Sequence, residues 1–151
     1  MAYGFRRVED GLLDGGIRKN YCFEGDRGEN LLETIETTAR ANRVANGVII
    51  SAIGTLENCR IHRVTSQKLP PEEEYVDIDG PLEINSASGV IANGRLHAHI
   101  SVSDAKGTYG GHLEPGSRIL YLAEVVIAEI TGVSFDRVRN MATGLSLLMA
   151  V

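Results

Sequence analysis

The chain has 151 residues and a mass of 16.3 kDa, which suffices for one domain with its own hydrophobic core but not for two. Hydrophobic residues make up 43% of it and charged residues 23%, a balance that excludes both a disordered tail and a coiled coil. The formal net charge of −5 excludes a generally basic surface, so we do not expect direct binding to DNA. We expect a single domain over residues 1–151.

The apolar segments predict a soluble, cytoplasmic protein. They are short or interrupted by Glu124 and Glu129, and none approaches the roughly 20 residues that a membrane helix needs. The first residues contain no run that resembles the core of a signal peptide. The only two cysteines, Cys22 and Cys59, form no metal-binding pair, and we expect both to pack as small apolar groups in a reducing compartment.

One amphipathic helix is predicted within residues 26–46. Four apolar side chains recur at spacings of three and four and would share one stripe: Leu31, Leu32, Ile35 and Ala39. We expect Asp26 to cap the helix, with the Glu29 carboxylate accepting a hydrogen bond in return. Asn46 and Gly47 are expected to end it in a left-handed turn.

Strands are predicted over most of the remaining chain, which is rich in β-branched residues and punctuated by glycine. We expect them within residues 47–56, 59–66, 81–94, 95–104, 108–117, 118–132 and 144–151. The first is expected to be buried on both faces and the second to be half exposed. Residues 118–132 fit helix or strand by periodicity, and their β-branched content favours strand. Residues 69–81, with prolines and three successive glutamates, predict a solvated loop.

Together these elements predict an α+β fold: a mostly antiparallel sheet of about six or seven strands with one main amphipathic helix.

Three of the four histidines lie close together in the sequence, and they predict a metal site. His97 and His99 project from the same face of a strand because successive side chains alternate. If residues 103–107 form the bend of a hairpin, His112 returns opposite them. Three neutral imidazoles suit Zn²⁺ or another divalent transition metal and leave one position for water or substrate. We expect His62 to be a partly exposed strand residue without a metal role.

Carboxylates near such a metal could move protons if the ion activates water. Glu124 lies inside an apolar run and is therefore expected to be buried, which makes it a weak candidate for catalysis. Asp104 and Glu114 are more simply explained as turn or surface carboxylates. The pair Gly110-Gly111 before His112 would permit a close backbone approach or a bulge, or form a plain tight turn.

The order of these segments resembles the PPC domain, also called DUF296, which occurs alone in prokaryotes and joined to AT-hooks in plant nuclear proteins. The resemblance covers nearly the whole chain, and its specific part is the pattern H-x-H followed by G-G-H-L, met here by His97, His99 and His112. It implies an antiparallel sheet with a flanking helix, assembly as a homotrimer, and a metal held by those three histidines in some prokaryotic members. The Arg-Gly-Arg-Pro hook through which plant relatives bind DNA is missing from this sequence. A cupin also uses H-x-H on strands, but its glycine spacing is not met, so we rank it second.

Three hypotheses for function follow. The first is a homotrimeric regulatory or partner-binding module with a zinc site and an unknown protein or small-molecule partner. The second is a metal-dependent enzyme that activates water at the open zinc position. The third, an association with DNA binding, rests on the family label alone.

Overall fold

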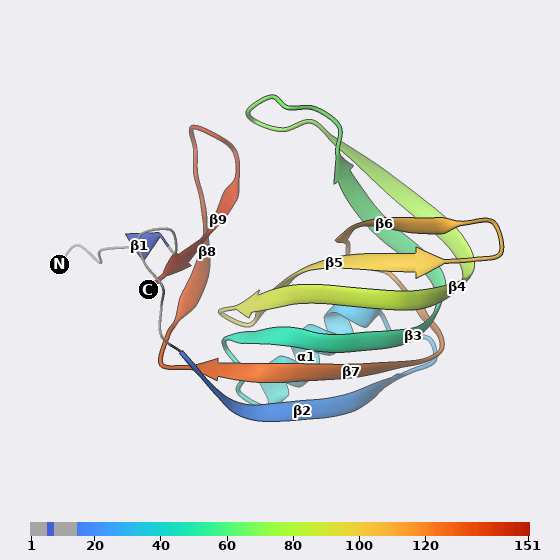
Figure 1. Cartoon of the computed structure of the whole chain (residues 1–151), viewed down its shortest axis with the longest axis horizontal. Coiled ribbons are helices and arrows are strands. Elements are labelled where there is room, and N and C mark those ends of the chain that lie inside the picture. The colour runs from blue at the N-terminus through green and yellow to red at the C-terminus, as the bar shows by residue number, and fades with distance from the viewer. Residues whose placement is uncertain (1–5, 8–14) are drawn as a thin grey trace.

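A mostly antiparallel β-structure with one helix is seen in the computed structural model, which describes residues 6–7 and 15–151 (Figure 1). The elements in chain order are β1 (Arg6–Arg7), β2 (Gly16–Asp26), α1 (Leu31–Ala41), β3 (Gly47–Val64), β4 (Glu73–Ala92), β5 (Arg95–Ser103), β6 (Thr108–Leu113), β7 (Ile119–Thr131), β8 (Phe135–Arg139) and β9 (Ser146–Ala150). The predicted α+β fold is confirmed.

The strands form two sheets. The larger has the order β2-β7-β3-β4-β5-β6, and the smaller has the order β1-β9-β8. The end of β3 also pairs with β6, at Ile61 with Leu113 and His62 with His112, so β3, β4, β5 and β6 form a closed ring of paired strands. This closure brings the end of β3 beside the β5–β6 hairpin. In Figure 1, α1 covers one face of the large sheet, and the β8–β9 hairpin stands to one side of it.

The core lies between α1 and the large sheet and is almost wholly aliphatic. All four residues of the predicted stripe are buried in it: Leu31, Leu32, Ile35 and Ala39. They pack with alternate side chains of the strands, such as Leu96, Ala98, Ile100 and Val102 of β5. Burial of this apolar surface is the main force that holds the helix against the sheet.

The helix begins later than predicted. Asn30 is its N-cap and makes no side-chain capping bond, so the expected cap at Asp26 is wrong. The Glu29 carboxylate does accept a hydrogen bond from the Asp26 backbone N–H, at 2.8 Å, but within a turn that precedes the helix. The backbone N–H groups of Gly28 and Leu31 donate to the carbonyls of Ile119 and Ser117, so these tertiary bonds hold residues 28–30 outside the helix.

The helix also ends earlier than predicted. Asn42 is its C-cap, and Arg43 adopts a left-handed conformation with φ of 61°. The Arg43 and Val44 N–H groups donate to the carbonyls of Arg40 and Ala39, which is the Schellman pattern. Val44 is buried, so its side chain anchors this end.

Several strand predictions need correction. The two strands expected at residues 47–56 and 59–66 are one strand, β3, with a register shift between Leu56 and Asn58. The expected loop at residues 69–81 is wrong beyond Glu72, because β4 starts at Glu73 and pairs with β3. The strands at residues 118–132 and 144–151 are confirmed as β7 and β9, whereas β1, β2 and β8 were not predicted.

One face of β3 is exposed in the single chain. Ile50 and Ile53 keep 55% and 47% of their surface exposed, so the expectation that the strand is buried on both faces is wrong. On the neighbouring strand β7, Leu122 lies on the same face and is 38% exposed, since Glu124, two residues along, pairs with Ile53. In the described part of the chain, no helix has the length and apolar character to cross a membrane.

Candidate metal centre

The β5–β6 hairpin brings the three predicted histidines together. His99 pairs with His112 and Ser103 with Thr108, the register expected from a bend at residues 103–107. His97 is half-buried and His99 exposed, while Leu96, Ala98 and Ile100 between and beside them face the core. The alternation of the strand therefore places both imidazoles on the face away from the core, where His112 joins them.

The geometry of this group fits a single ion. One ligand atom of each of His97, His99 and His112 lies within 4.8 Å of the others. Nitrogen ligands of one Zn²⁺, each at about 2.1 Å, lie at most about 4.2 Å apart, so the imidazoles are already near that spacing. The ring centroids of His97 and His112 are 4.6 Å apart, and those of His99 and His112 are 5.6 Å apart.

A second group adjoins the first through His112. His62 Nδ1 lies 2.6 Å from Glu114 Oε1, and the His62 ring stacks on that of His112 with centroids 4.2 Å apart. His62, His112 and Glu114 also have ligand atoms within 4.8 Å of one another. His62 is on a strand, as expected. However, both His62 and Glu114 lie beside the predicted ligand His112. Finding them from the sequence required knowing that β3 extends far enough to pair with β6.

The surroundings favour neutral imidazoles. Burial, followed by the neighbouring His62, His97, His99 and Arg137, lowers the pKa of His112 from 6.5 to about 4. Burial and the nearby Arg137 lower the pKa of His97 from its ordinary value. A metal needs imidazole in its unprotonated form, so these nitrogens are available at neutral pH without the loss of a proton.

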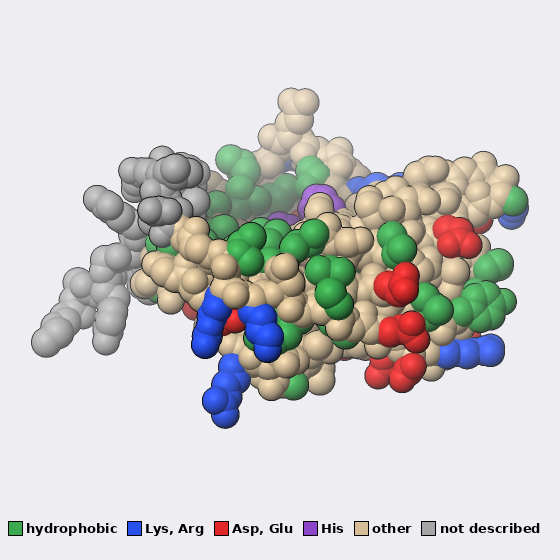
Figure 2. All heavy atoms as spheres, turned by 60° about the horizontal axis from the view of Figure 1, so that its bottom comes forward, with side chains coloured by type: hydrophobic (Ala, Val, Ile, Leu, Met, Phe, Trp, Pro, Cys, Tyr) green, Lys and Arg blue, Asp and Glu red, His purple; other side chains and the backbone are tan. Residues whose placement is uncertain are grey.

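The histidines face a large pocket of about 1100 Å³. Its walls come from α1, the end of β3, the β5–β6 hairpin, the segment leading into β4 and the β8–β9 hairpin. Figure 2 shows histidine side chains in a hollow of the surface beside hydrophobic side chains. Four arginines also line the pocket, namely Arg63, Arg95, Arg137 and Arg139.

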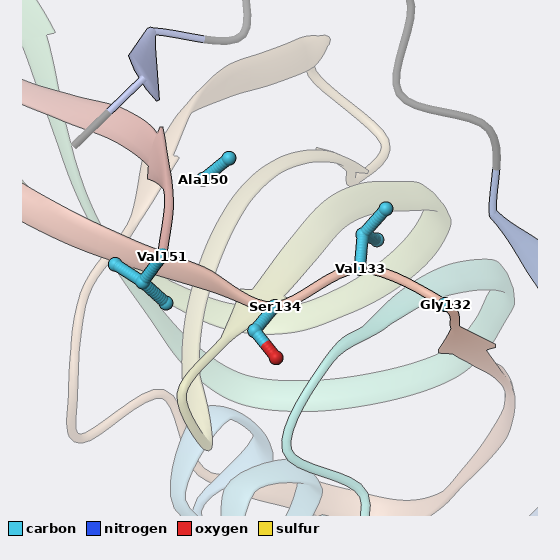
Figure 3. Close-up of a pocket in the computed structure, with 5 residues that line it drawn as sticks. All are labelled: Gly132, Val133, Ser134, Ala150 and Val151. Atoms are coloured by element: carbon cyan, nitrogen blue, oxygen red, sulfur yellow. The ribbon is translucent and has the colours of Figure 1, made fainter. Parts of the chain in front are cut away.

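A second cavity, of about 460 Å³, lies between the end of β7 and the end of β9 (Figure 3). Its lining residues are Gly132, Val133, Ser134, Ala150 and Val151. They contribute one hydroxyl group and no ionisable side chain, so the histidine pocket is the better candidate for a functional site.

Close backbone contact fixes the position of His112. A Cβ atom added to Gly111 would lie 2.7 Å from the His62 carbonyl oxygen, because β6 lies against β3 there. Gly110 and Gly111 are both within β6, so the close approach expected from the sequence is confirmed and the plain tight turn is wrong.

The three carboxylates considered from the sequence have different surroundings. Glu124 is exposed on β7, so the expectation of its burial is wrong, and it is not part of the lining of the histidine pocket. Asp104 is a turn carboxylate, as expected, and accepts hydrogen bonds from the backbone N–H groups of Lys106 and Gly107. Glu114 is the carboxylate that lies beside the histidines.

Comparison with known sequences identifies the family. The model of the Plants and Prokaryotes Conserved (PCC) domain matches residues 13–131. This match confirms the resemblance to the PPC domain and favours it over the cupin. Two relatives from Synechococcus strains, both named Bifunctional protein GlmU, are 36% and 35% identical to the chain over 118 and 142 residues. The matches cover 78% and 92% of this chain, but the chain spans only 18% and 21% of those relatives' length.

Solved structures share the fold. A metal-containing protein of Archaeoglobus fulgidus is 26% identical with a TM-score of 0.79, over 91% of this chain and 97% of its own. A plant- and prokaryote-conserved (PPC) protein of Pyrococcus horikoshii is 27% identical with a TM-score of 0.75, over 89% and 93%. A Bacteroides thetaiotaomicron protein whose name suggests DNA binding is 18% identical with a TM-score of 0.74, over 89% and 96%, and shows the fold alone.

Proposed function

Because the chain belongs to the Plants and Prokaryotes Conserved domain family, we propose that it is a homotrimeric module whose pocket holds a divalent metal, zinc, on His97, His99 and His112. The observation that carries the proposal is the convergence of three imidazole ligand atoms within 4.8 Å at the wall of a large pocket. The proposed role of this module is to regulate, or to bind, a protein or small-molecule partner.

Two further observations support the metal. Burial and neighbouring charge keep the pKa of His112 at about 4, so this ligand is neutral at physiological pH. The similar protein of Archaeoglobus fulgidus is described as metal-containing. Three neutral nitrogen ligands and no thiolate suit zinc among the common divalent ions.

The trimer is supported by exposed apolar side chains on the large sheet. Ile50 and Ile53 on β3 keep about half of their surface exposed in the single chain, and Leu122 on β7 keeps 38%. Packing such a face against neighbouring copies removes it from water. The number three comes from the family resemblance.

The role as a module is supported by the way the sequence match falls in the curated relatives. In both Synechococcus proteins the matching region is about a fifth of a longer chain. A region similar to this chain is thus found as one part of a longer protein. This arrangement is typical of a domain that acts together with other domains or proteins. A cytoplasmic location agrees with the two free cysteines, Cys22 and Cys59.

A metal-dependent enzyme is the second candidate, and Glu114 is the observation that favours it. When bound, zinc would lower the pKa of a coordinated water toward about 7. Glu114 and His62, 2.6 Å apart beside His112, could hold and pass on a proton there. Glu114 therefore replaces Glu124 as the carboxylate to test for catalysis.

Direct binding to DNA is not part of the proposal. The net charge of −5 leaves few phosphate contacts to offset the repulsion between the protein and DNA. We expect weak or no binding of duplex DNA in 150 mM salt, and a sequence-preferring complex with submicromolar affinity would contradict this expectation.

Elemental analysis tests the metal directly. Protein without a histidine tag, purified without chelator, should carry close to one divalent ion per chain. His99→Ala should lose most of it, because two imidazoles bind an ion far less tightly than three.

His62→Ala is the matched control, since His62 belongs only to the second group. It should keep the ion, and loss of the ion in this variant but not in His99→Ala would place the metal at His62, His112 and Glu114. Absence of any transition metal, with no uptake on reconstitution, would refute the site.

A further inference from the structure

Arg137 carries a positive charge into the histidine pocket and has no acidic partner among the described residues. It lies on β8, lines the pocket, and is close enough to His97 and His112 to lower the pKa of each. Its Nε atom is buried, and none of the described residues accepts a hydrogen bond from it. Burying such a donor without a partner is costly, so an arginine in this state calls for an acceptor that residues 15–151 do not supply.

The acidic groups of the pocket already have other partners. Glu36 accepts a hydrogen bond from the Leu96 N–H and lies 3.7 Å from Arg40, while Glu73 and Glu114 lie beside His62. None of these carboxylates is paired with Arg137. Within residues 15–151, Arg63, Arg95 and Arg139 form no ion pair either, so the pocket has four arginines without acidic partners in this part of the chain.

The pocket is shaped for a small ligand. The loop before β4 and the β8–β9 turn are in contact with each other, since a Cβ atom added to Gly144 would lie 2.7 Å from Cβ of Pro70. Both residues line the pocket, together with Pro71, Leu145 and Leu147. The arginines therefore lie within a bounded site of about 1100 Å³ that combines positive charge with apolar walls.

We propose that this pocket binds a small molecule through an oxyanion, a carboxylate or phosphate group, with Arg137 as its main contact beside His97. A guanidinium offers two parallel N–H donors that match the oxygens of such a group, and the buried Nε would gain its missing acceptor. Arg95 and Arg139 add charge at the rim, where both side chains are exposed. The proposal does not depend on the metal ion, because its contacts are all to arginine.

Isothermal titration calorimetry on the full chain, freed of metal by chelation, tests this with two probes, inorganic phosphate and succinate, in 150 mM sodium chloride. We expect at least one to bind, and the comparison of the two distinguishes phosphate from carboxylate ligands. Arg137→Gln should weaken the binding at least tenfold. Repeating the titration with zinc-loaded protein shows whether the ion contributes to anion binding. A failure of the proposed metal site can therefore be distinguished from a failure of the proposed anion site.

Arg118→Gln is the matched control, since Arg118 is exposed, pairs with Glu57 at 3.6 Å and does not line the pocket. It should bind the probe like the unchanged protein. Arg137→Lys keeps the charge without the paired donors, and it should bind with intermediate affinity even if Arg137→Gln does not fold.

The absence of binding by either probe to the metal-free and the zinc-loaded protein would overturn the proposal. The proposal would also be overturned if Arg137→Lys, or a folded Arg137→Gln, bound the probe with the same affinity as the unchanged protein. Binding of duplex DNA through Arg137, without binding of either small anion, would also refute it.

Discussion

His112 is the residue on which the candidate site depends, because it belongs to both groups of ligand atoms and stacks on His62. Its pKa of about 4, lowered chiefly by burial, means that the folded protein resists protonation there. The unfolded chain takes up that proton near pH 6.5. The unfolded state therefore binds more protons between these two pH values, and protonation favours unfolding.

We therefore predict that metal-free protein loses stability as the pH falls from about 6.5 to about 4. The measurement is the thermal midpoint in the presence of a chelator. His112→Asn removes the group, so its midpoint should fall less over the same interval. An equal fall in both proteins would mean that other groups, such as carboxylates, account for the whole effect.

At the scale of elements, the contact between β3 and β6 determines whether the two histidine groups meet. Gly111 permits this contact, because a side chain there would collide with the His62 carbonyl, 2.7 Å from the added Cβ. We predict that Gly111→Ala destabilises the protein by about 1–3 kcal/mol and lowers its metal content.

The matched control is Gly107→Ala, since an added Cβ at Gly107 meets nothing within 4 Å. Its free energy of unfolding, measured in urea, should stay within about 0.5 kcal/mol of the unchanged protein. Equal effects of the two substitutions would show that the close contact at Gly111 does not matter.

Local pattern predicted the elements whose side chains alternate or recur regularly. The helical stripe from Leu31 to Ala39 and the register of His99 with His112 follow from periods of 3.6 and 2, and both are confirmed. The start of β4 was missed because its glutamates suggested a loop. The alternation of Val76 and Ile78 with exposed acidic residues was the available signal for a strand.

Features that depend on tertiary contacts could not be predicted. The helix starts at Leu31 because residues 28–30 bond to the chain around Ser117 and Ile119, which is distant in sequence. Glu114 and Arg137 reach the pocket through the β3–β6 and β8–β9 pairings. A sequence pattern shows which residues share a face, but it does not show which strand packs beside them.

At the scale of the whole molecule, the exposed apolar side chains of β3 and β7 suit an interface between copies. We predict a mass of about three times the 16.3 kDa chain by light scattering coupled to size exclusion. Ile53→Asp should shift the protein toward monomer, because a charge would be buried without a partner.

Met141→Asp is the control for this substitution, since Met141 is 87% exposed and lies in the turn between β8 and β9. It should leave the trimer intact. A stable monomer of the unchanged chain at micromolar concentration would refute the assembly, and a dimer would refute the number three.

The central claim is that three imidazoles on the β5–β6 hairpin hold one divalent ion. Its most direct test is a crystal structure of protein purified without added metal or chelator, with anomalous diffraction recorded on both sides of the zinc absorption edge. We predict one anomalous peak per chain, bonded to His97, His99 and His112. The absence of a peak, or a peak bonded instead to His62 and Glu114, would contradict the claim.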